Sequence, residues 1–195
     1  MIPRQQNLKI LLVRHAPVDP PGYLYGSTDA DIERVSSDVS KRLHSRLANC
    51  QAFFSSPALR CIKTYQAVFV ENPLPLQIKE FWEQDFGNWE GLTYNSIPDQ
   101  GELSGKDLVE FTPPNGESFL ELCHRTQPPL LKIISERKVG EIAIFAHAGV
   151  IRSFLALALD SKELALKFSI DNLSITAIEA LSNGQFSISF VNQSV

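Results

Sequence analysis

The chain of 195 residues has no run rich in lysine and arginine, and its formal net charge is −4. Nucleic-acid binding needs a basic face that displaces counterions, so that class is disfavoured. No apolar run approaches the ~18 residues of a membrane span, and the first residues hold too few apolar side chains for a signal-peptide core. We therefore expect a cytoplasmic protein without a nucleic-acid or membrane partner.

Cysteine is also scarce. Cys50, Cys61 and Cys123 are widely spaced and form no CxxC or CxxH pair, so a zinc site is not expected and reduced, partly buried thiols are the simplest interpretation. The chain lacks an HExxH motif and the aspartate cluster that would hold magnesium. The sequence therefore predicts no metal site and points to no cofactor.

The remaining composition is that of a soluble globular protein, with 44% hydrophobic and 21% charged residues. The length suits one domain with a hydrophobic core, and no repeat, low-complexity segment or linker divides the chain. We expect a single domain over residues 1–195.

Apolar patterns predict an alternation of strands and helices. Strands are expected at 8–14, 52–56, 76–80 and 141–147, and helices at 31–49, from Pro57 to about 70, at 117–138 and at about 149–159. Pro128 and Pro129 should break or kink the third helix, and residues 86–116 are expected to be mostly loop. Two alternating runs joined at Asn183-Gly184 predict a terminal hairpin. This order favours an α/β fold with a mostly parallel sheet and an antiparallel edge hairpin.

Polar side chains follow each predicted strand. Arg14 and His15 end the first strand, Arg60 lies early in the helix after the second, and His147 ends the fourth. The stretch FWEQDFGNWEG after the third strand offers carboxylates, at Glu83, Asp85 and Glu90. Ligands bind beyond the carboxyl ends of the strands in open α/β sheets, so we expect these groups to converge on one crevice.

Such a collection suits a phosphate dianion. The planar fork of arginine binds phosphate oxygens two at a time, and helix N-termini favour anions. A histidine between two guanidinium groups has its charged form disfavoured, so it stays neutral and nucleophilic near pH 7. We interpret Arg14 as holding a phosphoryl oxygen while His15 attacks phosphorus.

The whole chain resembles the histidine phosphatase superfamily, in its phosphoglycerate mutase-like branch. The segments that carry this resemblance, in the family's order, are LLVRHAPVD, SSPALRCIKT, EQDFGNWEG, NGESFLEL, FAHAGVIRS and DNLSIT. The resemblance implies a three-layer α/β/α sandwich. It also implies that His15 is the phosphorylated nucleophile, that Glu83 is the proton donor, and that the phosphate pocket consists of Arg14, Arg60 and His147.

The chain departs from the family pattern at three positions. Ala16 and Ala148 replace glycines, but both are small, so the backbone can still approach a phosphate. Pro21 stands where the family often has an asparagine, and we expect Ser27 or Thr28 to supply that contact instead.

The finer pattern bears on the substrate. RHAPVDPPGYLYGSTDADI resembles alpha-ribazole phosphatases, cobalamin-pathway enzymes that remove a phosphate from a nucleotide. Tyr25 and its neighbour Tyr23 either stack on a substrate base or pack locally. The loop at about 92–115 is expected to form one wall of the substrate site, with Leu103, Phe111, Pro113 and Pro114. The family's mutases usually carry a longer insertion here, which favours a phosphatase.

We therefore expect a metal-independent phosphomonoester hydrolase that acts through a phosphohistidine on a small phosphorylated metabolite, with alpha-ribazole phosphate one such ester. The alternatives are a phosphoglycerate mutase, a phosphatase of phosphohistidine proteins and, from another class, a non-catalytic phospholigand-binding module. A binding module needs neither a nucleophile nor an acid, so the presence of both argues against it. The edge hairpin leaves a homodimer open.

Overall fold

The computed structural model describes residues 7–99, 101, 103–137 and 140–195. Predictions for residues 1–6 and for residue 138 lie outside the described residues. The strands are β1 (Leu8–Arg14), β2 (Val18–Asp19), β3 (Asp31–Ile32), β4 (Ala52–Ser55), β5 (Leu76–Gln77), β6 (Gly140–Ala146), β7 (Ile175–Ala180) and β8 (Phe186–Gln193). The helices are α1 (Ser37–Leu47), α2 (Leu59–Val68), α3 (Gly105–Glu110), α4 (Phe119–Arg137), α5 (Ala148–Leu159) and α6 (Lys162–Ala165), with 3₁₀ turns at Lys79–Phe81, Gly87–Trp89 and Tyr94–Ser96.

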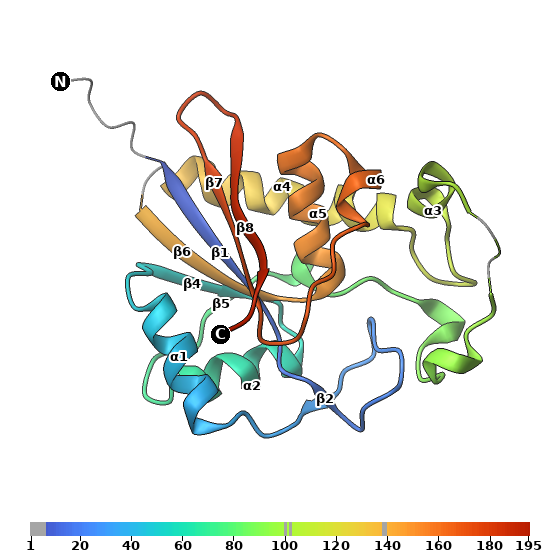
Figure 1. Ribbon diagram of the computed structural model, residues 1–195, viewed down its shortest axis with the longest axis horizontal. Helices are drawn as coiled ribbons and strands as arrows, with labels where there is room; N and C mark the ends of the chain where they lie inside the picture. The colour runs from blue at the N-terminus through green and yellow to red at the C-terminus, as the bar shows by residue number, and fades with distance from the viewer. Residues whose placement is uncertain (1–6, 100, 102, 138–139) are drawn as a thin grey trace.

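The main sheet has the strand order β5-β4-β6-β1-β7-β8 (Figure 1). Strands β5, β4, β6 and β1 run parallel, and β7 and β8 add the antiparallel hairpin at one edge. Leu8 pairs with Gly140 on one side and with Ala180 on the other, so β1 is a central strand. The predicted mostly parallel sheet with an antiparallel edge hairpin is confirmed.

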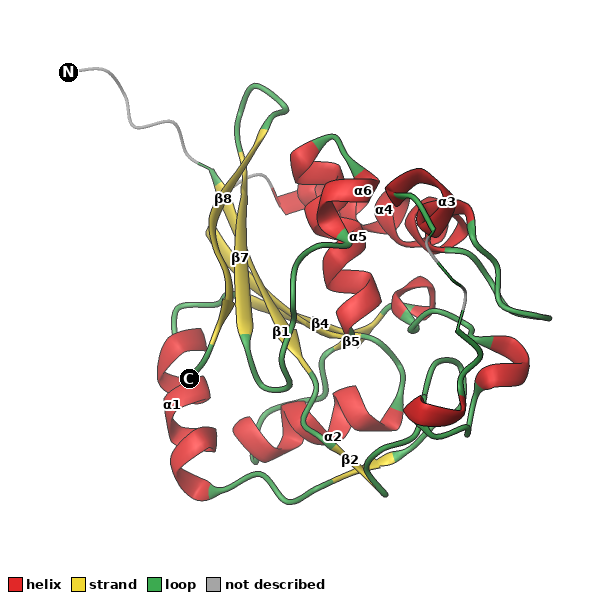
Figure 2. Cartoon of the chain, turned by 45° about the vertical axis from the view of Figure 1, so that its right-hand side comes forward, coloured by secondary structure: helices red, strands yellow, loops and turns green. Residues whose placement is uncertain are grey.

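Helices cover both faces of the sheet. Figure 2 shows α1 and α2 on one side of the strands and α4 and α5 on the other. Side chains of a strand alternate between its faces, so Ile10 and Leu12 join the core under α4 and α5, while Leu11 and Val13 pack with α1 and α2. Burial on both faces explains the unbroken apolar run of β1. The predicted three-layer sandwich is confirmed.

The predicted start of the first helix is wrong. Helix α1 begins at Ser37 rather than at residue 31, because the backbone of Ser36 is extended and its side chain accepts a hydrogen bond from Val39 N–H as the N-cap. Residues 31 and 32 form β3, where Ile32 pairs with Val18 of β2. The apolar residues spaced by three and four, which began at Ile32, therefore extended the predicted helix toward the N-terminus beyond its observed start.

Pro128 and Pro129 were expected to break or kink the helix; the break is wrong, because α4 continues through both prolines to Arg137, and the kink stays a prediction. A proline inside a helix costs about 3 kcal/mol. Apolar side chains are buried on either side of the pair, among them Leu122 and Leu130, and each such burial contributes roughly 1.5–3 kcal/mol. Packing against α5 therefore keeps the helix continuous.

One smaller prediction needs correction as well. The third strand is limited to Leu76–Gln77, and the chain then tightens into a 3₁₀ turn. The described residues of 86–116 are mostly loop, as expected, and they include the short helix α3, which Ser104 and Asp107 begin with a reciprocal capping box. Within the described part of the chain, no helix combines the length and apolar character needed to cross a membrane.

Candidate active site

The strand ends bring the predicted polar residues together. Strands β1, β4 and β6 are parallel, so the segments that follow them meet at one edge of the sheet. The rings of His15 and His147 lie edge to face with centroids 5.2 Å apart. Arg60 donates from Nε to Nδ1 of His147 over 3.1 Å. The two histidines and Arg60 therefore form one cluster, as the sequence predicted.

His15 is held in one tautomer. Its Nδ1 lies 2.7 Å from the carbonyl oxygen of Ala16, which can only accept a hydrogen bond, so Nδ1 carries the proton and Nε2 carries the lone pair. Burial, followed by the charges of Arg60 and Arg14, lowers the pKa of His15 to about 3. The imidazole is therefore neutral at pH 7, with Nε2 available as a nucleophile.

Arg60 is almost fully buried and is held by protein acceptors. Its terminal nitrogens donate to the carbonyl oxygens of Gly26 at 2.7 Å and Thr28 at 3.0 Å. Its Nε–H bond to His147 leaves the proton of that ring on Nε2, which lies 2.8 Å from Ser56 Oγ. Both nitrogens of His147 are thus engaged, and burial, then Arg60, lowers its pKa well below 6.5. Its direct contact with phosphate stays a prediction.

Arg14 combines an anchored end with an unused donor. One terminal nitrogen donates to the carbonyl oxygen of Ile170 over 2.5 Å. Its buried Nε–H finds no acceptor among the described residues. Burial lowers the pKa of the guanidinium and the charge of Glu83 opposes that shift. Since buried donors are nearly always paired, this N–H suits an anion bound beside His15.

Glu83 is buried at the start of α5. Its Oε1 accepts from Gln84 N–H at 3.0 Å, and Oε2 accepts from Gly149 N–H at 3.1 Å. Ala148 opens this helix directly after His147. The neighbouring Asp85 instead accepts from Gly87 N–H within its own turn. Glu83 is thus the carboxylate of this loop that is fixed beside the histidine cluster.

The loop after β2 is tied to Glu90. The N–H groups of Ser27 and Thr28 donate to the two oxygens of this carboxylate, and Phe86 N–H donates as well. Burial would raise the pKa of Glu90, but these hydrogen bonds prevail and lower it. Tyr25 donates from its hydroxyl to the carbonyl oxygen of Pro20. The phosphate and substrate contacts predicted for Ser27, Thr28 and Tyr25 stay predictions, because protein groups occupy these donors.

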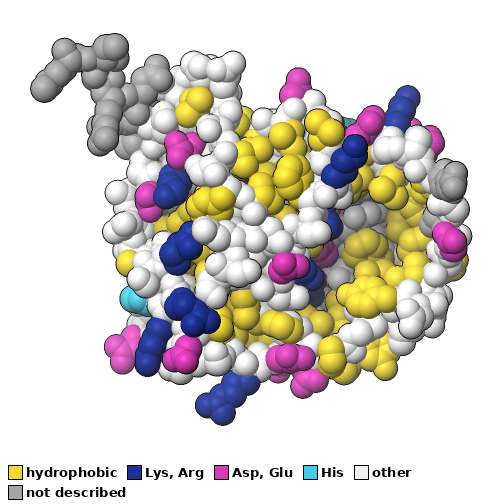
Figure 3. All heavy atoms as spheres, in the orientation of Figure 1, with side chains coloured by type: hydrophobic (Ala, Val, Ile, Leu, Met, Phe, Trp, Pro, Cys, Tyr) yellow, Lys and Arg dark blue, Asp and Glu magenta, His cyan; other side chains and the backbone are white. Residues whose placement is uncertain are grey.

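Part of the 92–115 loop lines a cavity of about 330 Å³ on the other side of the Glu83 loop. Its lining residues are Gln84, Phe86, Trp89, Leu108, Phe111, Pro113, Phe119, Arg152 and Leu166. Trp89 and Phe111 stack with their ring centroids 5.5 Å apart. Figure 3 shows this side of the molecule hollowed, with hydrophobic side chains around the hollow. Leu103 and Pro114 of the predicted wall are not among the lining residues.

Three supporting residues were not assigned roles from the sequence. Asn172 donates from Nδ2 to the carbonyl oxygen of His15, and Thr64 accepts from Ala16 N–H, so both fix the backbone around His15. Glu90 was noted only as a further carboxylate. Asn172 lies in the DNLSIT segment that carries the family resemblance, which marked the segment but not the role of this residue. A side chain that binds a backbone group leaves no periodic pattern in the sequence. Within the described ranges, no group of three or more His, Cys, Asp and Glu side chains is arranged to hold a metal.

The same chain can be compared with known proteins. Residues 10–194 match the histidine phosphatase superfamily, branch 1. The chain belongs to this superfamily. The family and the enzyme class predicted from the sequence motifs are therefore confirmed.

Its relatives include a bifunctional protein of Mycobacterium tuberculosis, Rv2228c, which is 31% identical over 156 residues. That match covers 76% of this histidine phosphatase and 42% of the relative, so the chain spans about two fifths of that protein's length. A 6-phosphofructo-2-kinase/fructose-2,6-bisphosphatase of Arabidopsis thaliana is 27% identical over 132 residues. That match covers 66% of this chain and 17% of the length of the relative.

Solved structures share the fold. The mycobacterial glucosyl-3-phosphoglycerate phosphatase Rv2419c has a TM-score of 0.83 at 17% identity, covering 98% of this chain and 100% of that one. A candidate alpha-ribazole-5′-P phosphatase from Escherichia coli has a TM-score of 0.80 at 20% identity, covering 96% and 98% of the two chains. At these identities the likeness shows the architecture alone.

Proposed function

We propose that this histidine phosphatase is a metal-independent phosphomonoester hydrolase that works through a phosphohistidine at His15. The observation that carries the proposal is the state of His15: its Nδ1–H is bound to the carbonyl oxygen of Ala16, and its Nε2 has no hydrogen-bond partner among the described residues. The unused Nε–H of Arg14 supplies a donor for the phosphate beside it. The substrate class is a small phosphorylated metabolite.

The first step transfers the phosphoryl group to the enzyme. Nε2 of His15 forms a bond to phosphorus while the ester P–O bond breaks in line. The departing alcohol oxygen takes a proton from Glu83, and Arg14 and Arg60 neutralise charge on the equatorial oxygens. His147 contributes by holding Arg60 through its Nδ1.

The second step restores the enzyme. The Glu83 carboxylate accepts a proton from water, whose oxygen attacks phosphorus while the P–N bond to His15 breaks. Inorganic phosphate leaves, and His15 returns to its neutral form. The charges for both steps come from the side chains of the site, so we propose that no metal ion takes part.

Alpha-ribazole phosphate is the ester that we propose to test first. Two features support it: the pattern of residues 14–32, and a structural neighbour described as a candidate alpha-ribazole-5′-P phosphatase. The aromatic cavity beside the Glu83 loop offers Trp89 and Phe111 as stacking surfaces for a base. A cytoplasmic location and a homodimer stay predictions.

The experiment is a panel of phosphomonoesters combined with trapping of the phosphoenzyme. The panel holds alpha-ribazole phosphate, sugar phosphates, and phosphoglycerates with and without bisphosphoglycerate. We expect phosphate release and an acid-labile adduct that peptide mass spectrometry places on His15. Transfer between positions of phosphoglycerate without phosphate release would favour a mutase. Ligand binding without any adduct would favour the non-catalytic module.

A further inference from the structure

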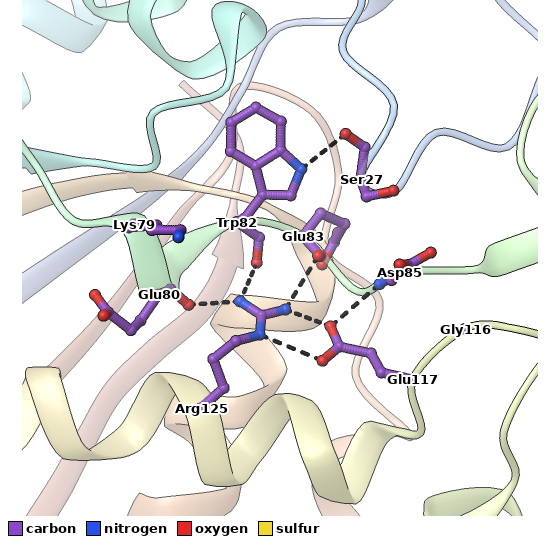
Figure 4. A pocket seen from close by; sticks show the side chains of 9 residues that line it. All are labelled: Ser27, Lys79, Glu80, Trp82, Glu83, Asp85, Gly116, Glu117 and Arg125. Atoms are coloured by element: carbon purple, nitrogen blue, oxygen red, sulfur yellow. Dashed lines mark hydrogen bonds and ion pairs between the residues drawn. The ribbon is translucent and has the colours of Figure 1, made fainter.

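Arg125 of α4 reaches across to the backbone of the loop that carries Glu83. One terminal nitrogen donates to the carbonyl oxygens of Glu80 at 2.6 Å and Trp82 at 2.9 Å. The other donates to the carbonyl oxygen of Glu83 at 3.2 Å (Figure 4). One guanidinium therefore holds three carbonyl groups within four consecutive residues.

The remaining donors of Arg125 bind Glu117. Nε donates to Oε2 at 3.3 Å, and the second terminal nitrogen forms a charge-assisted bond to Oε1. Arginine has five N–H donors in a rigid fork, and each finds an acceptor here. A lysine offers fewer donors from a single point and cannot reproduce this arrangement.

The Glu117 side of the loop is fixed as tightly. Glu117 Oε1 also accepts from Asp85 N–H at 3.1 Å, and Glu117 N–H donates to the carbonyl oxygen of Asp85 at 2.8 Å. A Cβ at Gly116 would lie 2.5 Å from that same carbonyl oxygen, so the two backbones touch. Arg125 therefore fixes the backbone of the loop from Glu80 to Glu83, and Glu117 fixes it at Asp85.

We propose that Arg125 is a positioning residue that fixes the reach of Glu83 toward the leaving oxygen. This inference rests on the proposed role of Glu83 as the general acid. Arg125 forms no hydrogen bond to the histidine cluster among the described residues, and its charge is the last of the causes that lower the pKa of His147. Its direct contacts near Glu83 are with the backbone at 80, 82 and 83. A shift of about 1 Å in a reacting group can cost on the order of 10²-fold in rate, so a loosened loop should weaken proton donation.

The first test compares leaving groups in Arg125→Ala and Arg125→Lys. Alkyl phosphates need the proton, whereas nitrophenolate leaves without it. We expect Arg125→Ala to slow alkyl ester cleavage by roughly 10–100-fold, with Arg125→Lys between it and wild type. The nitrophenolate burst should change little. Equal slowing of both reactions in a folded variant would show a merely structural role and overturn the inference.

Chemical rescue gives an independent readout. Arg125 lines an open cavity of about 470 Å³ together with Lys79, Trp82 and Asp85. Guanidinium or methylguanidinium, far below denaturing concentrations, should enter the space left in Arg125→Ala and restore alkyl ester cleavage selectively. Lys132→Ala is the matched control, because Lys132 lies on the same helix and its ammonium group forms an ion pair with the exposed Glu136. It should behave like wild type and show no response to guanidinium.

A double-mutant cycle with Glu83→Gln keeps the test decisive if Arg125→Ala is unstable. Arg125→Lys should cost almost nothing on alkyl esters once Glu83 can no longer give up a proton. A full further loss in the double variant would overturn the inference. A wild-type protein that forms no phosphohistidine would overturn the proposed function together with this inference. If the wild type forms the phosphohistidine but the effects of Arg125→Lys and Glu83→Gln simply add, only the role of Arg125 would be overturned.

Discussion

Gly149 lies directly against the carboxylate of Glu83. Its backbone N–H donates to Oε2 over 3.1 Å, and a Cβ added at position 149 would come within 2.5 Å of Oε1 and 2.9 Å of Leu122 Cδ2. Only a residue without a side chain allows this carboxylate to bind the N-terminus of α5. The backbone at the start of α5 thus sets where the side chain of Glu83 can lie.

Gly149→Ala should therefore displace Glu83. We expect alkyl phosphate cleavage to slow by on the order of 10²-fold, because the acid no longer lies where the leaving oxygen departs. Steady-state kinetics on an alkyl ester measures this effect. Ala148→Gly is the control, since it changes the same helix end without adding atoms. An unchanged rate in Gly149→Ala would show that the contact does not matter for catalysis.

His15→Ala should remove activity on every phosphomonoester while the fold survives. The side chain lies beyond the end of β1, and among the described residues its ring hydrogen-bonds only to the adjacent Ala16. Turnover and circular dichroism test the two halves of this prediction. A variant that keeps a tenth of wild-type turnover would exclude His15 as the nucleophile.

EDTA should leave wild-type activity unchanged, because the proposed mechanism uses no metal ion. Strong inhibition by EDTA would contradict that proposal.

Glu83→Gln keeps the shape of the side chain but cannot give up a proton. We expect it to slow hydrolysis of alkyl phosphates by ~10²–10⁴, the usual contribution of a positioned acid. The burst of nitrophenolate from para-nitrophenyl phosphate should slow much less, since that leaving group needs no proton. If burst and alkyl cleavage slow alike, Asp85→Asn becomes the next variant to examine.

In the proposed mechanism, Arg60→Ala removes a positive charge beside the transferring phosphoryl group. The loss should amount to about 3 kcal/mol, or about a hundredfold in rate. Vanadate should also bind this variant more weakly than wild type. Arg46→Ala is the matched control, because Arg46 lies on α1 and binds Gln193 near the surface. Equal vanadate inhibition of wild type and Arg60→Ala would argue against a phosphate contact.

The buried histidines make stability depend on pH. The pKa of His15 is lowered to about 3, by burial first and then by Arg60 and Arg14, while the ordinary value is 6.5. Between these values the unfolded chain binds a proton that the folded chain excludes, so the free energy of unfolding falls as pH falls through this window. The slope should approach about 1.4 kcal/mol per pH unit for each such histidine.

Urea unfolding at several pH values between about 7 and 5 measures this slope. His15→Gln should be less sensitive to pH than wild type over the same range, because it has no proton to exclude. His147 contributes in the same direction, so part of the slope should remain. Parallel curves for wild type and His15→Gln would contradict the prediction.

The sequence placed the histidines and Arg60 well because each follows a strand. A strand is recognisable from its apolar run, and parallel strands must end at one edge, so Arg14, His15, Arg60 and His147 could be brought together without coordinates. Asn183-Gly184 predicted its turn for a similar local reason. Gly184 adopts a positive φ of 83° in the loop between β7 and β8.

Other features depended on contacts that have no local signal. The strand at Asp31–Ile32 depended on Ile32 pairing with Val18, and the continuity of α4 through its prolines depended on its burial against α5. Arg125 and Glu90 form hydrogen bonds with backbone groups of distant loops. Such a hydrogen bond requires no particular side chain in the residue whose backbone it binds, so the sequence does not reveal it.

The central position of β1 also determines when the molecule can fold. Leu8–Arg14 pairs only with β6 and β7, whose residues are 140–146 and 175–180. During synthesis this apolar strand therefore has no sheet neighbour until residues 140–146 have been made, and it gains its second neighbour only with residues 175–180. Non-local pairing of this kind slows folding and leaves the strand open to misassociation meanwhile.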